Sequence, residues 1–178
     1  MAKTSNLREF QEAILLKLKD VATQGDIEST SRLGVRVGSK NLLVSLIQVR
    51  EVLPAPPVQS VPLTSPWFLG VTNVRGSLYS LTDLAQFLGL SATAKTNNTR
   101  ILLLNPDTTS GVTTQVALLI GGLLGLRNLD AMEIKQDAPK GEIFFCNQVY
   151  QDAEGVEWFE VDFEMLVKQQ DFIQPTLN

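Results

Sequence analysis

Short apolar stretches separated by turn-forming residues dominate this sequence from Arg32 onward. In the first stretch Leu33, Val35 and Val37 alternate with other residues, and Gly38 opens a polar turn before the next stretch begins. Such alternation is typical of strands buried on one face, and the stretches are too short for long helices. The pattern therefore predicts a mainly β protein of the barrel type, with too many strands for one small barrel and hence two lobes.

The turns and prolines also indicate where each strand lies. Residues 47–53 are predicted to form a short helical turn, with Val49 and Val52 inward and Arg50 outward. The stretch 54–66 is rich in proline, whose fixed φ angle and missing N–H donor predict an extended connection over the surface. The strands are expected at 32–37, 42–46, 67–74, 77–81, 101–104, 115–120, 125–129, 143–150 and 156–161.

The first 31 residues carry a helical pattern instead. Apolar residues recur there at intervals of three and four, which predicts an amphipathic helix followed by a polar linker; they are Leu7, Phe10, Ile14, Leu18 and Val21. We therefore divide the chain into an N-terminal helical extension and linker, 1–31, and a domain of two β-barrel lobes, 32–178. Within that domain Asp83 is predicted to cap a short helix and Asp162 a C-terminal one.

The residue counts exclude most catalytic and metal chemistry. The 178 residues include no histidine and a single cysteine, Cys146. Serine or cysteine nucleophiles activated by histidine are therefore ruled out, and a structural zinc site needs more nitrogen and sulfur ligands than one thiol supplies. Because Cys146 lies in an apolar run, we expect it to be a small core residue. We expect no enzyme activity, no catalytic residue, no metal and no cofactor.

Charge and hydropathy limit the partners. The formal net charge of −4 argues against binding to nucleic acid, which requires clustered Lys and Arg. The charge is uneven, with net +4 over residues 1–100 and net −8 over residues 101–178, which is compatible with two faces that meet different partners. The longest apolar run, 116–126, is too short to cross a bilayer. We expect a cytoplasmic protein without direct membrane insertion.

An acidic cluster near the C-terminus leaves a second type of function open. Its members are Glu154, Glu157, Glu160, Asp162 and Glu164. They could hold a cation or a small ligand inside a β-barrel protein, although the spacing of a calcium-binding loop is missing. The alternative is a solvated surface in which Asp162 and Glu164 begin a helix, where the helix dipole favours negative charge.

Two pairs of residues stand out as candidates for a contact. Glu51 and Arg75 each lie among apolar residues, and a partly buried charge normally needs a partner, so we predict that they form an ion pair. Trp67 and Phe68 follow the proline-rich connection. This aromatic pair is either an exposed anchor for another protein, since aromatic side chains often dominate interfaces, or a plug between the two lobes.

The segments that carry these residues resemble the CheW-like coupling-protein family. The similarity rests on Val-Arg-Glu-Val-Leu at 49–53, on Asn-Val-Arg-Gly at 73–76 followed by Asp-Leu at 83–84, and on the order of the later apolar stretches, over about residues 32–170. The resemblance implies two intertwined five-stranded SH3-like β-barrels. It also implies a non-enzymatic adaptor that joins the cytoplasmic tip of a methyl-accepting chemoreceptor to the regulatory domain of a CheA-type histidine kinase.

The resemblance also suggests which residues matter. The positions that match the family motifs, as interaction or structural sites, are Val49, Glu51, Val52, Asn73, Arg75, Gly76 and Asp83. In this interpretation Arg75 positions a receptor-facing turn, and the segment 49–53 supplies apolar contact. Trp67 and Phe68 remain candidate interface aromatics.

Several positions depart from the family pattern. Gly121 stands where the family usually has Asp, Gln148 where it commonly has Gly, and Ser80 where it usually has Pro. With the N-terminal extension, these departures make the chain more similar to the PilI branch of the family, which serves type IV pilus (twitching) signalling. A flagellar chemotaxis coupling protein is the alternative. Either role implies a location beside the inner membrane, at receptor arrays.

Overall fold

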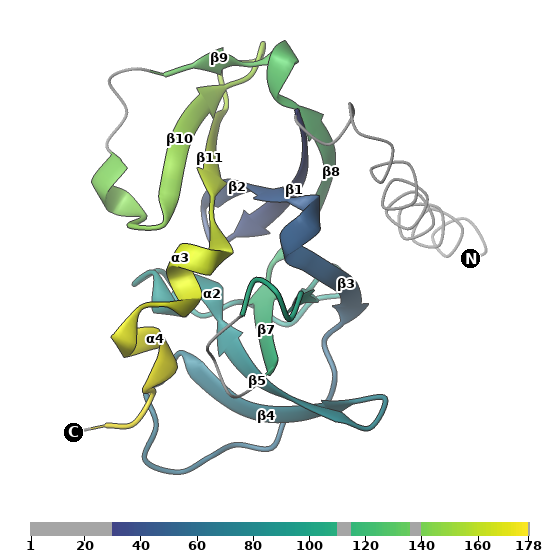
Figure 1. Cartoon of the computed structure of the whole chain (residues 1–178), viewed down its shortest axis with the longest axis vertical. Coiled ribbons are helices and arrows are strands. Elements are labelled where there is room, and N and C mark those ends of the chain that lie inside the picture. The colour runs from purple at the N-terminus through teal and green to yellow at the C-terminus, as the bar shows by residue number, and fades with distance from the viewer. Residues whose placement is uncertain (1–29, 110–114, 136–139, 178) are drawn as a thin grey trace.

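The computed structural model describes residues 30–109, 115–135 and 140–177, so the expected N-terminal helix lies outside the described residues. In the described ranges eleven strands form two sheets, stacked along the long axis of the molecule (Figure 1). The strands are β1 Ser31–Val37, β2 Lys40–Ser45, β3 Val49–Pro54, β4 Phe68–Val74, β5 Ser77–Asp83, β6 Arg100–Leu104, β7 Gln115–Ile120, β8 Gly122–Asn128, β9 Glu133–Ile134, β10 Cys146–Gln151 and β11 Glu157–Val161.

The two sheets are intertwined along the chain. The order in the first sheet is β8-β1-β2-β11-β10-β9, and in the second it is β3-β6-β7-β5-β4. The chain therefore begins one lobe, completes the whole of the other with β3–β7, and then returns to the first. Two parallel pairings, β2 with β11 and β5 with β7, join segments that are distant in sequence. The expected mainly β, two-lobed fold is confirmed, with the two-residue β9 as a sixth strand of the first sheet.

The segment 47–53 differs from its sequence prediction. A 3₁₀ turn covers Leu46–Gln48, and the rest is strand β3 and not a helical turn. Val49 pairs with Leu104 whereas Glu51 pairs with Leu103, so Arg50 is an extra residue in a β-bulge. The bulge restores Val52 to the same face as Val49. Val49 and Val52 are therefore two inward residues separated by three positions, which is also the spacing of inward residues in a helix.

Strands β6 and β7 of the second sheet are covered on both faces, and this explains why both are almost entirely apolar. Leu102, Leu118 and Ile120 belong to the larger core cluster, which is shared with the six-stranded lobe. Ile101, Leu103 and Leu119 belong to a smaller cluster on the other face. A strand buried on both faces has no polar side, so it loses the alternation seen in β1.

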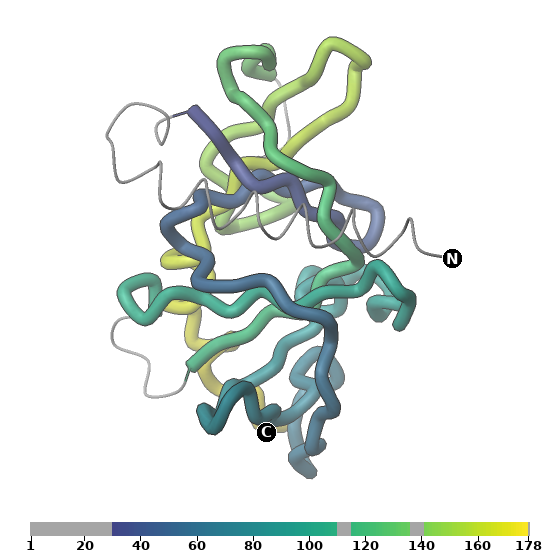
Figure 2. The backbone as a smooth tube through the Cα atoms, turned by 90° about the vertical axis from the view of Figure 1, so that its right-hand side faces the viewer, coloured from purple at the N-terminus to yellow at the C-terminus, as the bar shows by residue number. Residues whose placement is uncertain are grey.

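Short helices and the C-terminal segment connect the lobes. Helix α2 spans Leu84–Phe87. The expected C-terminal helix, from Phe163 to about Gln170, is α3, Phe163–Val167, and a second short helix, α4, Gln170–Ile173, follows it. Figure 2 shows that the C-terminal segment (yellow) descends from the six-stranded lobe along the other lobe. There it forms a bridge to the proline-rich connection, with the Ser65 N–H donating to the Pro175 carbonyl and the Leu177 N–H donating to the Leu63 carbonyl at 3.0 Å.

The boundaries of two later strands also differ from the prediction. Strand β8 begins at Gly122, and β10 begins only at Cys146, after a 3₁₀ turn at Lys140–Glu142. Ile143 and Phe145 are fully buried although they lie outside the strand. None of the helices in the described ranges is long and apolar enough to cross a membrane.

Candidate interaction surface at the β4–β5 turn

The hairpin between β4 and β5 turns in two residues. Val74 pairs with Ser77, and the loop residues Arg75 and Gly76 have φ angles of 49° and 87°. Two positive φ angles define a type I′ turn, whose twist matches the flanking strands. The Asn73 side-chain oxygen accepts a hydrogen bond from the Gly76 N–H at 2.8 Å and closes the turn. Asn73 and Gly76 thus have a clear structural role in the hairpin.

Arg75 reaches from this turn to Glu51 on β3. Arg75 Nη1 lies 2.8 Å from Glu51 Oε2, and Nη2 lies 2.7 Å from Oε1, which is a bidentate ion pair. The predicted pairing is confirmed. Since β3 and β4 are the two outer strands of the five-stranded sheet, the ion pair joins opposite ends of that sheet.

The exposure of the ion pair was not anticipated. The Arg75 side chain keeps 72% of its surface exposed and Glu51 keeps 30%, so the guanidinium is not the half-buried group that its apolar neighbours suggested. The hydrogen bonds that Arg75 donates to Glu51, and then the charge of Glu51, raise the pKa of Arg75 above its ordinary value. The cation is therefore permanently displayed at the surface.

Val49 and Val52, which were expected to offer an apolar contact, lie in the core and not on the surface. Both are buried in the larger core cluster, because the bulge at Arg50 turns them to the inner face of β3.

An exposed apolar residue that the family motif does not include lies on β5. Leu78 is 64% exposed and pairs across the hairpin with Asn73. The alternation of residues along β5 could have indicated that Leu78 is exposed, because its neighbours Tyr79 and Leu81 point inward. Glu51, Asn73, Arg75 and Leu78 are called the hairpin surface below.

Asp83 is a buried structural residue. Its Oδ1 accepts from the Ala85 N–H at 3.1 Å and from the Thr93 hydroxyl at 2.7 Å, and its Oδ2 accepts from the Thr93 N–H at 2.7 Å. One carboxylate thus caps α2, as predicted, and also holds the loop that follows the helix. A residue this well buried cannot contact a partner directly.

Trp67 lies between the lobes. Its ring is stacked on Phe172 of α4 at 6.1 Å between centroids and meets Phe87 of α2 edge-on at 4.9 Å. Phe87 also contacts Phe144, which precedes β10. This aromatic seam, formed by Trp67, Phe87, Phe144 and Phe172, favours the plug over the exposed anchor. Phe68 is half-buried and touches Trp67 edge-on.

Four of the five members of the acidic cluster have separate partners or roles. Glu157 pairs with Lys135, Glu160 pairs with Arg32 at 2.8 Å, and Glu164 pairs with Lys168. Asp162 caps α3. Among the described residues no three or more of His, Cys, Asp and Glu are grouped so that they could hold a metal ion. These four residues therefore form separate ion pairs, of which that between Glu160 and Arg32 is largely buried, and a helix cap.

Comparisons with known proteins identify the family of this domain. The CheW-like domain family matches residues 32–171. Protein PilI of Pseudomonas aeruginosa is 34% identical over 82 residues, and the probable chemotaxis protein CheW of Rhizobium etli is 34% identical over 67 residues. These alignments cover 46% and 38% of this chain and less than half of each relative, 46% and 41%.

A solved structure shows the same fold. The scaffolding protein TtCheW from Thermoanaerobacter tengcongensis superposes with a TM-score of 0.65 at 12% sequence identity, over 83% of this chain and 99% of that one. Because the family match extends over most of the chain and includes both lobes, the two-lobed domain that carries the hairpin surface belongs to the CheW-like domain family.

Proposed function

We propose that this protein is a non-enzymatic adaptor that couples the cytoplasmic tip of a methyl-accepting chemoreceptor to the regulatory domain of a CheA-type histidine kinase. Membership in the CheW-like domain family and similarity to a scaffolding protein of that fold support the proposal. The adaptor acts by holding two partners together and not by chemistry on a substrate. In that role it lies on the cytoplasmic side of the inner membrane, at receptor arrays.

The ion pair between Glu51 and Arg75 is the observation that carries the proposal. It fixes an exposed turn in one conformation and leaves the Arg75 guanidinium and the Leu78 side chain accessible. A surface that is ordered before binding loses little conformational entropy when a partner docks. An exposed cation beside an exposed leucine offers both a polar and an apolar contact. We assign this hairpin surface to the receptor tip.

The experiment is a calorimetric titration of the full chain with each of the two partners. Arg75→Asn is the informative variant. Asn-Gly is a favoured pair in a type I′ turn, so the change keeps the turn while it removes the cation and its ion pair with Glu51. We expect Arg75→Asn to weaken receptor binding about tenfold, as loss of a charge-assisted contact does. Lys168→Gln removes one exposed cation at the C-terminal end of α3 and is the matched control.

Two results would contradict the proposal. The first is failure of the wild-type chain to bind either partner at micromolar concentration. The second is unchanged receptor binding by Arg75→Asn and by Leu78→Ser, which would remove the hairpin surface from the interface. A cooperative thermal transition in each variant confirms that the fold is intact, so that lost binding reports on the contact itself.

The signalling system to which the adaptor belongs is proposed to be that of type IV pili. Similarity to Protein PilI of Pseudomonas aeruginosa supports this assignment. Similarity to the probable chemotaxis protein CheW of Rhizobium etli supports flagellar chemotaxis as the second candidate. Titration with kinase regulatory domains from both systems separates the two, and tighter binding to the flagellar kinase would overturn the pilus assignment.

A further inference from the structure

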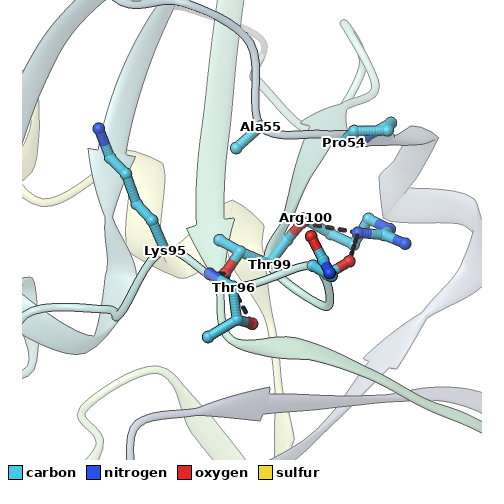
Figure 3. Close-up of a pocket in the computed structure, with 7 residues that line it drawn as sticks. Pro54, Ala55, Lys95, Thr96, Thr99 and Arg100 are labelled. Atoms are coloured by element: carbon cyan, nitrogen blue, oxygen red, sulfur yellow. Dashed lines mark hydrogen bonds between the residues drawn. The ribbon is translucent and has the colours of Figure 1, made fainter.

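A pocket with two cationic side chains in its lining lies between the end of β3 and the loop that leads into β6 (Figure 3). It has a volume of about 670 Å³, and its lining includes Pro54, Ala55, Lys95, Thr99 and Arg100. Figure 3 shows Lys95 and Arg100 on either side of Thr96 and Thr99, below Pro54 and Ala55 of the facing segment. Two of the lining side chains are cations and none is acidic. None of them belongs to the hairpin surface.

Arg100 is buried without a carboxylate partner in the described part of the chain. It is only 8% exposed. Its Nη1 donates to the carbonyls of Asn97 and Thr99, both at 2.8 Å, which accounts for both N–H groups of that nitrogen. Within the described ranges Nε and Nη2 make no hydrogen bond and no ion pair. Taking a charge out of water is costly unless an opposite charge or hydrogen bonds compensate it.

The unpartnered edge of this guanidinium has the geometry of an anion site. Nε–H and Nη2–H point in parallel from one side of the planar group, and this edge makes paired hydrogen bonds with a carboxylate or a phosphate. The edge is not sealed inside the protein. In the described residues the buried side-chain atoms without a partner are Asn41 Oδ1 and Arg127 Nε, so Nε and Nη2 of Arg100 remain accessible.

The loop around the pocket is held in shape by its own hydrogen bonds. The Thr99 hydroxyl donates to the Ala94 carbonyl at 2.8 Å and accepts from the Thr96 N–H at 2.8 Å. The carbonyls of Asn97 and Thr99 fix the guanidinium from one side. Lys95 is exposed and adds positive charge without a described ion-pair partner. The site is therefore ordered before any ligand arrives.

We propose that this pocket binds an oxyanion, with the Nε–Nη2 edge of Arg100 as its hydrogen-bonding group and Lys95 as an attracting charge. A carboxylate and a phosphate share the required chemistry, because each presents two oxygens to a guanidinium edge. The ligand is either a free phosphorylated compound or an acidic side chain of a protein partner. The inference does not depend on receptor or kinase binding.

The test is a titration of ¹⁵N-labelled full-length chain observed by NMR. Inorganic phosphate and acetate are added separately at constant ionic strength, which sodium chloride maintains. The expected result is a saturable shift of the Arg100 Nε–H signal and of the backbone amides of residues 95–100. Phosphate saturating at lower concentration than acetate assigns a phosphoryl ligand, and the reverse order assigns a carboxylate such as a partner's acidic side chain.

Variants separate this site from general anion effects. Arg100→Gln is expected to weaken binding at least about tenfold, and Lys95→Gln about threefold, because the first removes the hydrogen-bonding edge and the second a more distant charge. Lys168→Gln is the matched control and should bind as the wild type does. If Arg100→Gln does not fold, anion binding is tested by the shift of the Arg100 Nε–H signal in the wild type and by the weaker binding expected for Lys95→Gln. Shifts that stay linear with both anions, or that persist unchanged in Lys95→Gln and Arg100→Gln, would overturn the proposal.

Discussion

The indole ring of Trp67 is stacked on the phenyl ring of Phe172, with 6.1 Å between centroids and 7° between planes. Trp67 precedes the outer strand of the five-stranded lobe, whereas Phe172 lies on α4, beyond the last strand of the six-stranded lobe. The contact therefore ties the C-terminal end of the domain to the lobe that the chain completed much earlier. It adds to the shared core as a second connection between the lobes.

We predict that Trp67→Ala lowers the free energy of unfolding by about 2–4 kcal/mol, since a large half-buried ring in the aromatic seam is lost. Phe172→Ala is expected to have a similar effect, and the double variant to show a coupling of about 1 kcal/mol. Urea unfolding monitored by circular dichroism measures the free energy of unfolding of the two single variants and of the double variant. Phe144→Ala, at the exposed end of the seam, should cost less. Additive effects of the two single substitutions would contradict the stacking interaction.

The two hydrogen-bonding roles of Asp83 predict an unusually large effect for one carboxylate. Asp83→Ala removes the cap of α2 and the contacts to Thr93, and it should cost about 2–3 kcal/mol. Thr93→Val keeps the cap but loses the hydroxyl hydrogen bond, so its cost should be about 1 kcal/mol. Asp107→Ala is the control, because Asp107 is exposed. Chemical unfolding compares them, and equal stability of Asp83→Ala and Asp107→Ala would be inconsistent with the structure.

Position 76 requires glycine because of its backbone conformation and not because neighbouring atoms leave no room for a side chain. Its φ angle is 87°, yet an added Cβ would meet nothing within 4 Å. Gly76→Ala should therefore destabilise the protein by about 1–2 kcal/mol through backbone strain alone. Gly141, where a Cβ is equally free of contacts and φ is not in the left-handed region, is the matched control. Thermal unfolding of Gly141→Ala should be close to that of the wild type, and a similar loss in both variants would argue against the type I′ turn.

The hairpin between β10 and β11 predicts a dependence of stability on acid. The indole N–H of Trp158 donates to Asp152 at 2.9 Å, and this bond, followed by that from the Val156 N–H, lowers the pKa of Asp152 below its ordinary value of 3.8. A carboxyl whose pKa is lower in the folded state stabilises the protein above pH 3.8, and this stabilisation is lost as the pH falls through the folded pKa.

Asp152→Asn tests this directly. The difference in unfolding free energy between wild type and Asp152→Asn should be constant above about pH 5 and should shrink below pH 4. Unfolding monitored by tryptophan fluorescence at several pH values measures it. A difference that does not change with pH would show that Asp152 has the same pKa in the folded and unfolded states. Asp107→Asn, at an exposed position, is the matched control.

Strands with a regular pattern could be predicted from the sequence, and irregular segments could not. The alternation of Leu33, Val35 and Val37 correctly predicted β1, because the inward residues of this strand and the turn that follows it can be recognised from neighbouring residues in the sequence. The bulge at Arg50 breaks that alternation, so β3 was mistaken for a helical turn. The helix expected from Phe163 to about Gln170 likewise ends earlier, at Val167, and α4 follows it as a separate helix.

Some features of the candidate sites could likewise be predicted from the sequence, and others could not. The Glu51–Arg75 ion pair could be anticipated because two charges among apolar residues need a partner. The aromatic seam could not be chosen over an exposed anchor, since Phe87 and Phe172 approach Trp67 only in the folded chain. The free edge of Arg100 depends on which carbonyls occupy Nη1, and residue order alone does not specify that.

The parallel pairing of β2 with β11 has a consequence for biosynthesis. Leu42 finds its partner Phe159 more than a hundred residues later in the chain. At a translation rate of about 5–20 residues per second, roughly 6 to 23 seconds pass between the emergence of these two strands. During that interval one side of β2 has no strand to pair with, and its apolar residues are open to chaperones or to other nascent chains. A ribosome that pauses before residue 157 prolongs this exposure, and one that stops there releases a chain with an unfinished lobe.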